Sequence, residues 1–248
     1  MRTLAIIALR DEERYAPGYF DHLRRFVDGF AVVDDGSLDK TPLIIRQEPK
    51  LKFSFRRDVR EPDHFFEVDN REILMNAAKD LNAEWVLCCD TDERYETPFL
   101  EKINSVQDEA DKIGKPVVGF RVLSLRESLK TYYAVEQSRI LTKFLMFRVP
   151  NEISYADRPR RALHTPWLPA GLRDQHLLWS TEYRVYHFCS LRAEDRRRRY
   201  EKFKRIDPDN KWQPIGYDHL IQEDGVRLKE IEPGREFDLH SVPPDLLT

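Results

Sequence analysis

Two pairs of acidic residues, each placed directly after an apolar run, have the residue types and the spacing to bind a metal ion. Asp34 and Asp35 follow the run FAVV, and Asp90 and Asp92 follow the run WVLCC. A carboxylate at the carboxyl end of a buried strand lies in the crevice where open α/β sheets bind ligands. An Asp-x-Asp pair there can hold a divalent cation against a diphosphate. The two pairs therefore predict a metal ion, a nucleotide and group-transfer chemistry.

The elements that position these residues alternate between short apolar strands and amphipathic helices. Strands are expected at residues 4–9, 30–33, 53–55 and 85–89. The first of them, a continuous apolar run, is expected to be buried on both faces. Helices are expected between the strands, with Tyr19, Leu23, Phe26 and Phe30 at helical spacing in the first interval. This alternation predicts a β-α-β-α-β-α-β series with a largely parallel sheet.

Local signals mark where two of the later helices begin. Asp69 and Glu72 form a capping-box pattern before the apolar run that leads to residue 85. Thr97 and Pro98 open a further helix, whose apolar positions continue to a stop at Gly114.

The second half of the chain predicts a mixed-sheet extension. Residues 117–123, 141–149 and 183–189 are expected to form strands, and residues 194–205 a basic helix followed by a charged tail. Residues 151–169, rich in Pro and Arg, are expected to form a loop.

Composition limits the classes of protein that remain. The chain has 248 residues, a formal net charge of −3 and a pI near 6.2, which does not point to an obligatory nucleic-acid partner. Its apolar runs are far shorter than the roughly 20 residues of a membrane-spanning helix. Three cysteines, two of them adjacent, form neither a disulfide framework nor a CxxC site. We expect a cytoplasmic protein without a transmembrane segment, either free or peripheral to the membrane. The chain contains neither GxGxxG nor GxxxxGK[ST].

The order of motifs in the first hundred residues resembles that of family 2 nucleotide-sugar glycosyltransferases with the GT-A fold. The matching segments are the first strand with DEE, then VVDDGSLDKT, NRE and VLCCDTDERY. The resemblance implies an α/β, Rossmann-like, mostly parallel mixed sheet flanked by helices, in a single domain with a C-terminal extension. The glycosyltransferase domain would span residues 1–190, with a nucleotide-binding half at 1–114 and an acceptor half at 115–190. The basic helix and tail would occupy residues 191–248.

The resemblance assigns the metal to the second acidic pair. It implies that Asp92 is a direct ligand and that Asp90 reaches the ribose or contacts the metal through water. Departure of a nucleoside diphosphate builds negative charge on its β-phosphate, and a bridging cation stabilises that charge. Carboxylate oxygens suit Mn²⁺ or Mg²⁺. Solvated turn aspartates are the structural alternative.

The resemblance assigns the nucleotide to the first acidic pair. Asp35 matches the residue that accepts a hydrogen bond from a nucleobase imide, which favours a UDP- or dTDP-sugar and leaves a GDP-sugar open. A turn-capping or helix-capping role is equally compatible with these aspartates. The remaining positions expected to bind the donor nucleotide are Leu9, Arg10, Glu12, Asp34, Asn70 and Arg71. The chain has Asp11-Glu12 where the family commonly has Asn-Glu.

A late histidine is expected to complete the metal site. His187, within the strand-like VYHFC, resembles the family's metal-binding histidine, and an imidazole ligand favours Mn²⁺ over Mg²⁺. His164 is the alternative ligand and His176 a weaker third. A packed histidine without a ligand role is the structural alternative.

The catalytic base is not marked by a motif. An inverting transfer, the commoner outcome in this family, needs a carboxylate to take the proton of the acceptor hydroxyl. Asp157, Asp174 and Glu182 are candidates by region alone. The acceptor, a glycan, a lipid-linked molecule or another hydroxyl compound, stays open. Without a QxxRW motif or membrane helices, we expect addition of a single sugar.

The basic helix leaves three further interpretations open. Its arginines at 196–199 are consecutive and so wrap around the helix, which is typical of a solvated helix paired with acidic residues. Contact with the donor phosphates, an anionic lipid surface and nucleic acid are the alternatives. A sugar nucleotidyltransferase is the rival enzyme, although the glycine-rich loop it would need after the first strand is absent.

Overall fold

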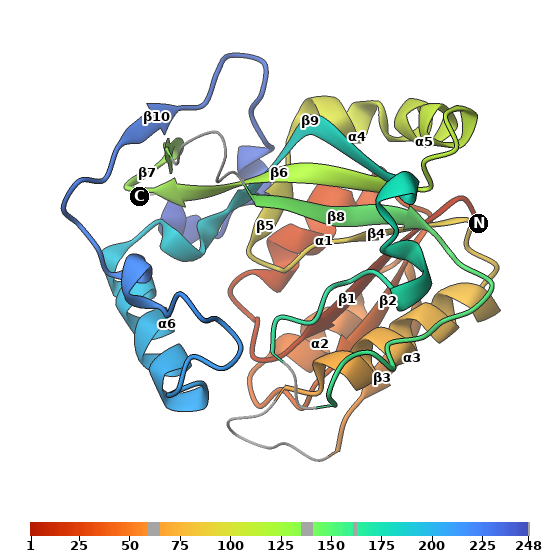
Figure 1. Cartoon of the computed structure of the whole chain (residues 1–248), viewed down its shortest axis with the longest axis horizontal. Helices are drawn as coiled ribbons and strands as arrows, with labels where there is room; N and C mark the ends of the chain where they lie inside the picture. Colours follow the sequence, from red (N-terminus) through yellow and green to blue (C-terminus); the bar gives the residue numbers. More distant parts are fainter. Residues whose placement is uncertain (59–64, 135–140, 161–162, 248) are drawn as a thin grey trace.

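The computed structural model describes residues 1–58, 65–134, 141–160 and 163–247. A mixed sheet runs through the molecule, with helices on both faces (Figure 1). Its strand order is β10-β7-β6-β8-β4-β1-β2-β3, and β5 and β9 pair with each other beside β6. Within the described residues, no helix combines the length and apolar character needed to cross a bilayer.

The first half of the chain forms the expected β-α-β-α-β-α-β series. Its strands β1, β2, β3 and β4 are parallel neighbours in the order β4-β1-β2-β3. The strands are β1 (Thr3–Leu9), β2 (Gly29–Asp34), β3 (Leu51–Arg56) and β4 (Trp85–Cys88). The helices are α1 (Ala16–Arg24), α2 (Thr41–Gln47) and α3 (Glu67–Asp80). Because β1 lies between β2 and β4, its buried Leu, Ile and Ala side chains form the centre of the core.

The second half extends the sheet mainly through antiparallel pairs, in keeping with a mixed-sheet extension. β8 pairs antiparallel with β4 and β6, and β9 runs parallel to β6. The strands are β5 (Glu93–Tyr95), β6 (Val117–Arg126), β7 (Ser128–Tyr133), β8 (Leu141–Arg148), β9 (Leu178–His187) and β10 (Leu228–Glu230). The helices are α4 (Thr97–Glu101), α5 (Ile103–Lys112) and α6 (Ala193–Ile206). Short 3-10 turns lie at Ala170–Leu172, Gln175–Leu177, Phe188–Ser190, Asp218–Leu220, Leu239–Ser241 and Pro244–Leu246.

Three local predictions were wrong. The capping box is absent, because α3 begins at Glu67 and the side chains of Asp69 and Glu72 instead form ion pairs with Arg160. The helix expected from residue 97 to Gly114 is interrupted at Lys102, where the backbone leaves helical geometry between α4 and α5. Helix α1 ends at Arg24, so Phe26 lies beyond it and the helical spacing does not continue to Phe30, which lies in β2 as the expected strand at residues 30–33 requires.

The C-terminal segment packs against the N-terminal half. The buried guanidinium of Arg94 donates to the backbone oxygen of Ser241 at 2.8 Å. That oxygen also lies against Gly18 of α1, where a Cβ atom would overlap it. A second apolar cluster, which includes Tyr186, Phe188 and Phe237, joins the end of β9 to this segment. The chain end therefore helps to hold β5 in place.

Candidate active site

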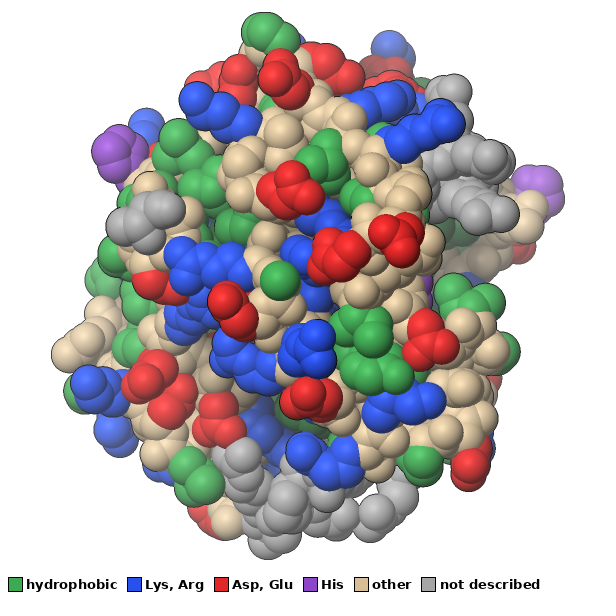
Figure 2. All heavy atoms as spheres, turned by 90° about the vertical axis from the view of Figure 1, so that its left-hand side faces the viewer, with side chains coloured by type: hydrophobic (Ala, Val, Ile, Leu, Met, Phe, Trp, Pro, Cys, Tyr) green, Lys and Arg blue, Asp and Glu red, His purple; other side chains and the backbone are tan. Residues whose placement is uncertain are grey.

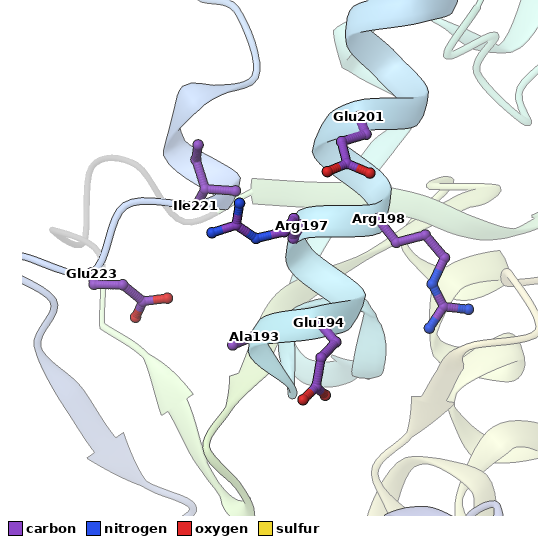
Figure 3. A pocket seen from close by; sticks show the side chains of 7 residues that line it. All are labelled: Ala193, Glu194, Arg197, Arg198, Glu201, Ile221 and Glu223. Atoms are coloured by element: carbon purple, nitrogen blue, oxygen red, sulfur yellow. The ribbon is translucent and has the colours of Figure 1, made fainter.

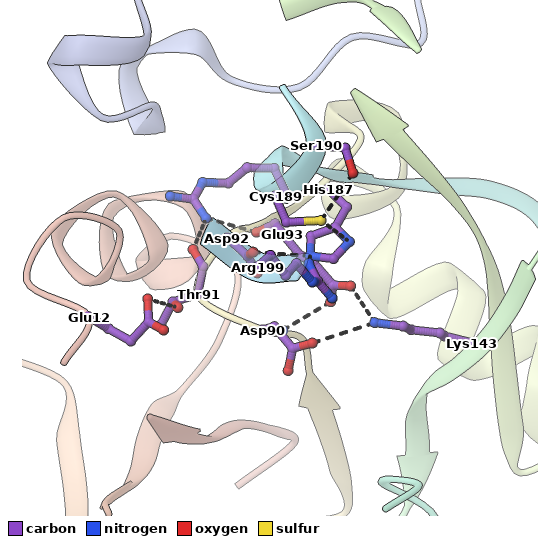
Figure 4. A network of polar contacts seen from close by, with 11 residues as sticks. Glu12, Asp90, Thr91, Asp92, Glu93, Lys143, His187, Cys189, Ser190 and Arg199 are labelled. Carbon is purple, nitrogen blue, oxygen red and sulfur yellow. Dashed lines mark hydrogen bonds and ion pairs between the residues drawn. The ribbon is translucent and has the colours of Figure 1, made fainter. Parts of the chain in front are cut away.

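Strand β5 places a histidine beside the second acidic pair. Glu93 of β5 pairs with His187 of β9 in an antiparallel ladder, and the Phe188 amide donates to the Asp92 carbonyl at 2.9 Å. As a result, Nε2 of His187 lies 3.0 Å from Oδ2 of Asp92 (Figure 4). The sequence pointed to both residues but not to the three-residue strand that joins them.

A cysteine missed by the sequence analysis contacts the other side of this imidazole. Sγ of Cys189 lies 3.3 Å from Nδ1 of His187. Ligand atoms of Asp92, His187 and Cys189 lie within 4.8 Å of one another, so this donor set can hold a metal ion. Partners on the second ring nitrogen commonly fix the tautomer and orientation of a metal-binding histidine. The spacing His-x-Cys was the only sequence signal for Cys189.

The Asp92–His187 pair is electrostatically coupled. Burial alone would raise the pKa of Asp92, but the neighbouring His187 and Arg199 bring it below its usual range. Burial disfavours the charged imidazole, yet Asp92 raises the pKa of His187 well above its usual range. A metal bound at Nε2 must therefore displace a proton from His187, so metal affinity is expected to rise with pH.

Lys143 of β8 faces the same turn and was not predicted from the sequence. Its ammonium lies 2.6 Å from Oε1 of the fully buried Glu93 and 3.5 Å from Oδ2 of Asp90. The Asp90 backbone amide donates to the other oxygen of Glu93 at 3.0 Å. These contacts fix the turn while nearly half of the Asp90 side chain (47%) stays exposed. Asp90 is thus available to a ligand.

The loop after β1 connects the two acidic pairs. Thr91 Oγ1 donates to Oε2 of Glu12 at 2.6 Å, and Arg94 holds the Thr91 carbonyl at 2.7 Å. Burial and the nearby Asp92 raise the pKa of Glu12 to about 8, although the Thr91 hydrogen bond opposes this shift. On the other side, Arg10 donates to Oδ2 of Asp35 at 2.6 Å. One short loop therefore contacts residues of both acidic pairs.

Asp35 is the centre of a buried polar cluster. Its second carboxylate oxygen accepts a hydrogen bond from Arg57 at 2.9 Å, and Arg57 also donates to Oδ1 of Asn70 at 2.7 Å. Asp34 accepts from the Ser37 amide at 2.8 Å, which is the turn-capping contact considered as an alternative. Leu9 is buried, and its carbonyl accepts from the Asp35 amide at 2.9 Å.

Two other residues predicted from the sequence, Arg71 and His164, are associated with the segment 163–169. Arg71 contacts this segment, and His164 belongs to it. The Arg71 guanidinium stacks on the Trp167 ring, with its central carbon 3.2 Å from the ring centroid. His164 packs against Phe203 and Tyr217, with ring centroids 5.4 and 6.5 Å away. His187, not His164, is therefore the histidine that contacts Asp92.

The three candidate bases have partners away from the Asp90–Asp92 turn. Asp157 forms an ion pair with Arg173, and Glu182 pairs with Arg121 at 2.5 Å. Asp174 caps a 3-10 turn by accepting from the amide of His176, which is itself exposed. Glu182 precedes His187 by five residues in β9, roughly 16 Å along an extended strand.

The sheet topology explains why the acidic pairs converge. Leu9 lies opposite Asp34 in the β1–β2 ladder, and Ile6 lies opposite Cys88 in the β1–β4 ladder. Both pairs therefore follow the carboxyl ends of parallel strands on either side of β1. Adjacent strands are about 4.8 Å apart, so the two strand ends are separated by about 10 Å. A single nucleotide-sugar is long enough to contact both acidic pairs across that distance.

Comparison with solved structures identifies the fold. The chain is similar to TarS from S. aureus, a glycosyltransferase of GT-A fold, with a TM-score of 0.50 and 17% identity over 89% of this chain and 42% of that one. Two structures of TarS residues 1–349, in complex with UDP and with UDP-GlcNAc, each give a TM-score of 0.50 and 16% identity over 89% of this chain and 70% of theirs. The chain thus spans less than half of the TarS chain in the first of these structures. Neither protein-family models nor curated proteins give a match to the sequence.

The expected fold class is thereby confirmed: this α/β chain has a GT-A fold, with a large curled sheet flanked by helices.

Proposed function

We propose that the protein is a metal-dependent glycosyltransferase that moves one sugar from a nucleoside diphosphate to an acceptor hydroxyl. The observation that carries this proposal is the contact between Asp92 and His187. It lies next to Thr91, which donates to Glu12 of the loop after β1, and Arg10 of the same loop donates to Asp35. The candidate metal-binding residues, Asp92 and His187, and the candidate base-binding residue, Asp35, therefore lie on either side of the carboxyl end of β1. The GT-A fold supports the same assignment.

The residues present fit a divalent cation. Asp92 and Nε2 of His187 would hold it, Asp90 would approach it directly or through water, and Cys189 would orient the imidazole. The ion would stabilise the charge that develops on the departing diphosphate. A nitrogen ligand favours Mn²⁺ over Mg²⁺.

The donor nucleotide would bind between β1 and β2. Asp35 would accept a hydrogen bond from the base imide, because its oxygens retain lone pairs beyond those used by Arg10 and Arg57. Complexes of TarS with UDP and UDP-GlcNAc support a uridine nucleotide, with dTDP and GDP as the other candidates. Further donor contacts are proposed for Leu9, Glu12, Asp34, Asn70, Arg71 and Asp90.

We propose inversion at the anomeric carbon and a single addition to each acceptor. A carboxylate would then remove the proton of the attacking hydroxyl. Asp157, Asp174 and Glu182 remain the candidates chosen from the sequence. In the structure their partners are Arg173, the His176 amide and Arg121.

Metal-dependent nucleotide binding tests the proposal. Thermal unfolding is measured with UDP, dTDP, GDP or CDP, with and without Mn²⁺. At least one nucleotide should raise the midpoint in a metal-dependent manner. Asp92→Ala should abolish this increase, and Asp80→Ala, at an exposed position on α3, should leave it unchanged. Failure of all four nucleotides to stabilise the protein in the presence of Mn²⁺ would contradict the assignment.

Product analysis separates the two enzyme classes. A glycosyltransferase releases a nucleoside diphosphate from a sugar nucleotide, whereas a sugar nucleotidyltransferase releases inorganic diphosphate from a nucleoside triphosphate and a sugar phosphate. Incubation with both substrate sets, followed by chromatography of the nucleotides, distinguishes these reactions.

The charge distribution does not favour nucleic-acid binding. Figure 2 shows Lys and Arg side chains interspersed with Asp and Glu on the side of the molecule that carries α6. Arg196 pairs with Glu223 and Arg198 with Asp195, both at 2.6 Å. Such pairing leaves fewer cations for a phosphate backbone.

A further inference from the structure

The four consecutive arginines of α6 lie in different environments. Arg196 is buried and donates to the Ser190 carbonyl at 3.0 Å. Arg197 is exposed and borders a shallow pocket of about 310 Å³ on the outer side of the helix (Figure 3). Arg198 pairs with Asp195. Arg199 instead extends toward Asp92 and His187 (Figure 4).

Arg199 is a partly buried cation that lacks a direct carboxylate partner. Its Nη1 lies 3.4 Å from Nε2 of His187, and its guanidinium carbon lies 5.5 Å from the Phe203 ring centroid. Among the described residues, no carboxylate oxygen lies within 4 Å of it. Burial lowers the pKa of Arg199, but the charges of Cys189, Asp92 and Asp90 raise it above its usual value. A guanidinium has five N–H donors in a planar fork. Most of these donors are therefore available to an anion.

Lys202 lies on the same side of α6, three residues further along the helix. Its ammonium lies 4.5 Å from the Phe65 ring centroid, and the Arg10 guanidinium lies 4.3 Å from the same centroid. Arg10 is the residue that binds Asp35. Arg199 is thus close to the candidate metal-binding residues, and Lys202 is close to Arg10, the partner of the candidate base-binding residue Asp35.

We propose that Arg199 and Lys202 bind the diphosphate of the donor and of the nucleotide product. This inference rests on the proposed function, because a diphosphate is the part of a nucleotide-sugar that lies between its base and its sugar. The planar fork of Arg199 can contact two phosphate oxygens, and Lys202 supplies a point charge. When the glycosidic bond breaks, the diphosphate keeps the bonding electron pair and gains a negative charge, which both cations stabilise.

Binding measurements on matched variants test this role. The first step is to find which of UDP, dTDP, GDP or CDP binds the wild-type protein most tightly with Mn²⁺ in isothermal titration calorimetry. That diphosphate and its parent nucleoside are then compared in Arg199→Gln, Lys202→Gln and Arg197→Gln. Arg197 is the control because its replacement removes the same charge from the outer side of α6.

Arg199→Gln should weaken diphosphate binding about tenfold or more, and Lys202→Gln should weaken it by a smaller factor. Neither change should alter nucleoside binding more than twofold, and Arg197→Gln should leave both affinities within twofold of wild type. Arg199→Lys should recover part of the loss. A purely structural role for Arg199 would instead lower both affinities together and reduce the unfolding midpoint without ligand.

The possible failures are distinguishable. If the wild-type protein binds no nucleoside diphosphate with Mn²⁺, both the proposed function and this inference are wrong. If the wild type binds one, and Arg199→Gln binds it as tightly as Arg197→Gln does, only the role of α6 is wrong.

Discussion

The Thr91 hydroxyl donates to the Glu12 carboxylate across 2.6 Å and so joins the loop after β1 to the turn after β4. Thr91 lies between the two aspartates of the Asp90–Asp92 pair. Glu12 follows Arg10 by two residues, and Arg10 holds Asp35. This single hydrogen bond therefore couples the position of the proposed metal-binding residues to that of Asp35.

Thr91→Val keeps the shape of the side chain but leaves the buried Glu12 carboxyl without this donor. We expect a loss of about 1–2 kcal/mol in the free energy of unfolding, measured by urea denaturation of the metal-free protein. In a Glu12→Ala background the same substitution should cost less, because the acceptor of the hydrogen bond is already removed. Equal costs in the two backgrounds would show that the hydrogen bond contributes little.

His187→Ala should weaken the dependence of nucleotide binding on Mn²⁺, because it removes the nitrogen that lies 3.0 Å from Asp92. His164→Ala should preserve that dependence, since His164 packs on Phe203 and Tyr217. Titration of Mn²⁺ at a fixed concentration of the best-binding nucleotide, followed by thermal unfolding, gives the comparison. The opposite pattern would transfer the ligand role to His164.

The buried His22 predicts loss of stability in acid. Burial lowers the pKa of His22 well below its usual value, and Arg94 adds to the effect. The unfolded chain therefore binds a proton near pH 6.5 that the folded chain excludes, so this contribution to stability is present above pH 6.5 and decreases as the pH falls. Between pH 7.5 and pH 5 it amounts to at most about 2 kcal/mol.

His22→Leu should accordingly reduce the difference in unfolding free energy between pH 7.5 and pH 5. The same replacement at the exposed His176 is the control and should leave the difference unchanged. Denaturant unfolding at both pH values measures the effect. An unchanged difference in His22→Leu would mean that other groups cause the acid sensitivity.

Gly18→Ala should destabilise the protein by about 1–3 kcal/mol, because its new methyl group would overlap the Ser241 carbonyl. Gly171→Ala is the matched control, since a Cβ atom there meets no atom within 4 Å. Thermal unfolding of both variants provides the test. Equal midpoints would indicate that the C-terminal segment moves away from α1 at little cost.

The first half of the fold was predictable because its signals are local. Residues 4–9 are continuously apolar, as a strand covered on both faces requires, and helical spacing marks the segments between strands. The acidic pairs follow those strands directly, so their convergence follows from the topology of a parallel sheet.

Strand β5 was not predictable in the same way. Two of its three residues, Glu93 and Arg94, are charged and fully buried. Besides local contacts with the Asp90 amide and the Thr91 carbonyl, they have partners in Lys143 and Ser241, which are distant in the sequence. A hydrophobic pattern could not reveal this strand, and without it the contact between Asp92 and His187 could only be inferred from the resemblance.

Lys143 was missed for a similar reason, and Arg199 was not distinguished from its neighbours in the basic helix. Lys143 comes from β8 and Arg199 from α6, and the sequence shows Arg199 only as one member of a basic run. Which arginine of that run faces the site depends on the rotation of α6. Packing of Phe203 against His164 and Tyr217 fixes that rotation.

The contact between Arg94 and Ser241 has a consequence for biosynthesis. Both acidic pairs have left the ribosome long before Ser241 is translated, yet the Arg94 guanidinium that supports the Thr91 carbonyl also depends on the Ser241 carbonyl. A nascent chain that ends before residue 241 therefore carries the aspartates without the finished turn between them. Completion of the Asp90–Asp92 turn is therefore expected to be a late event that follows translation of the C-terminal segment.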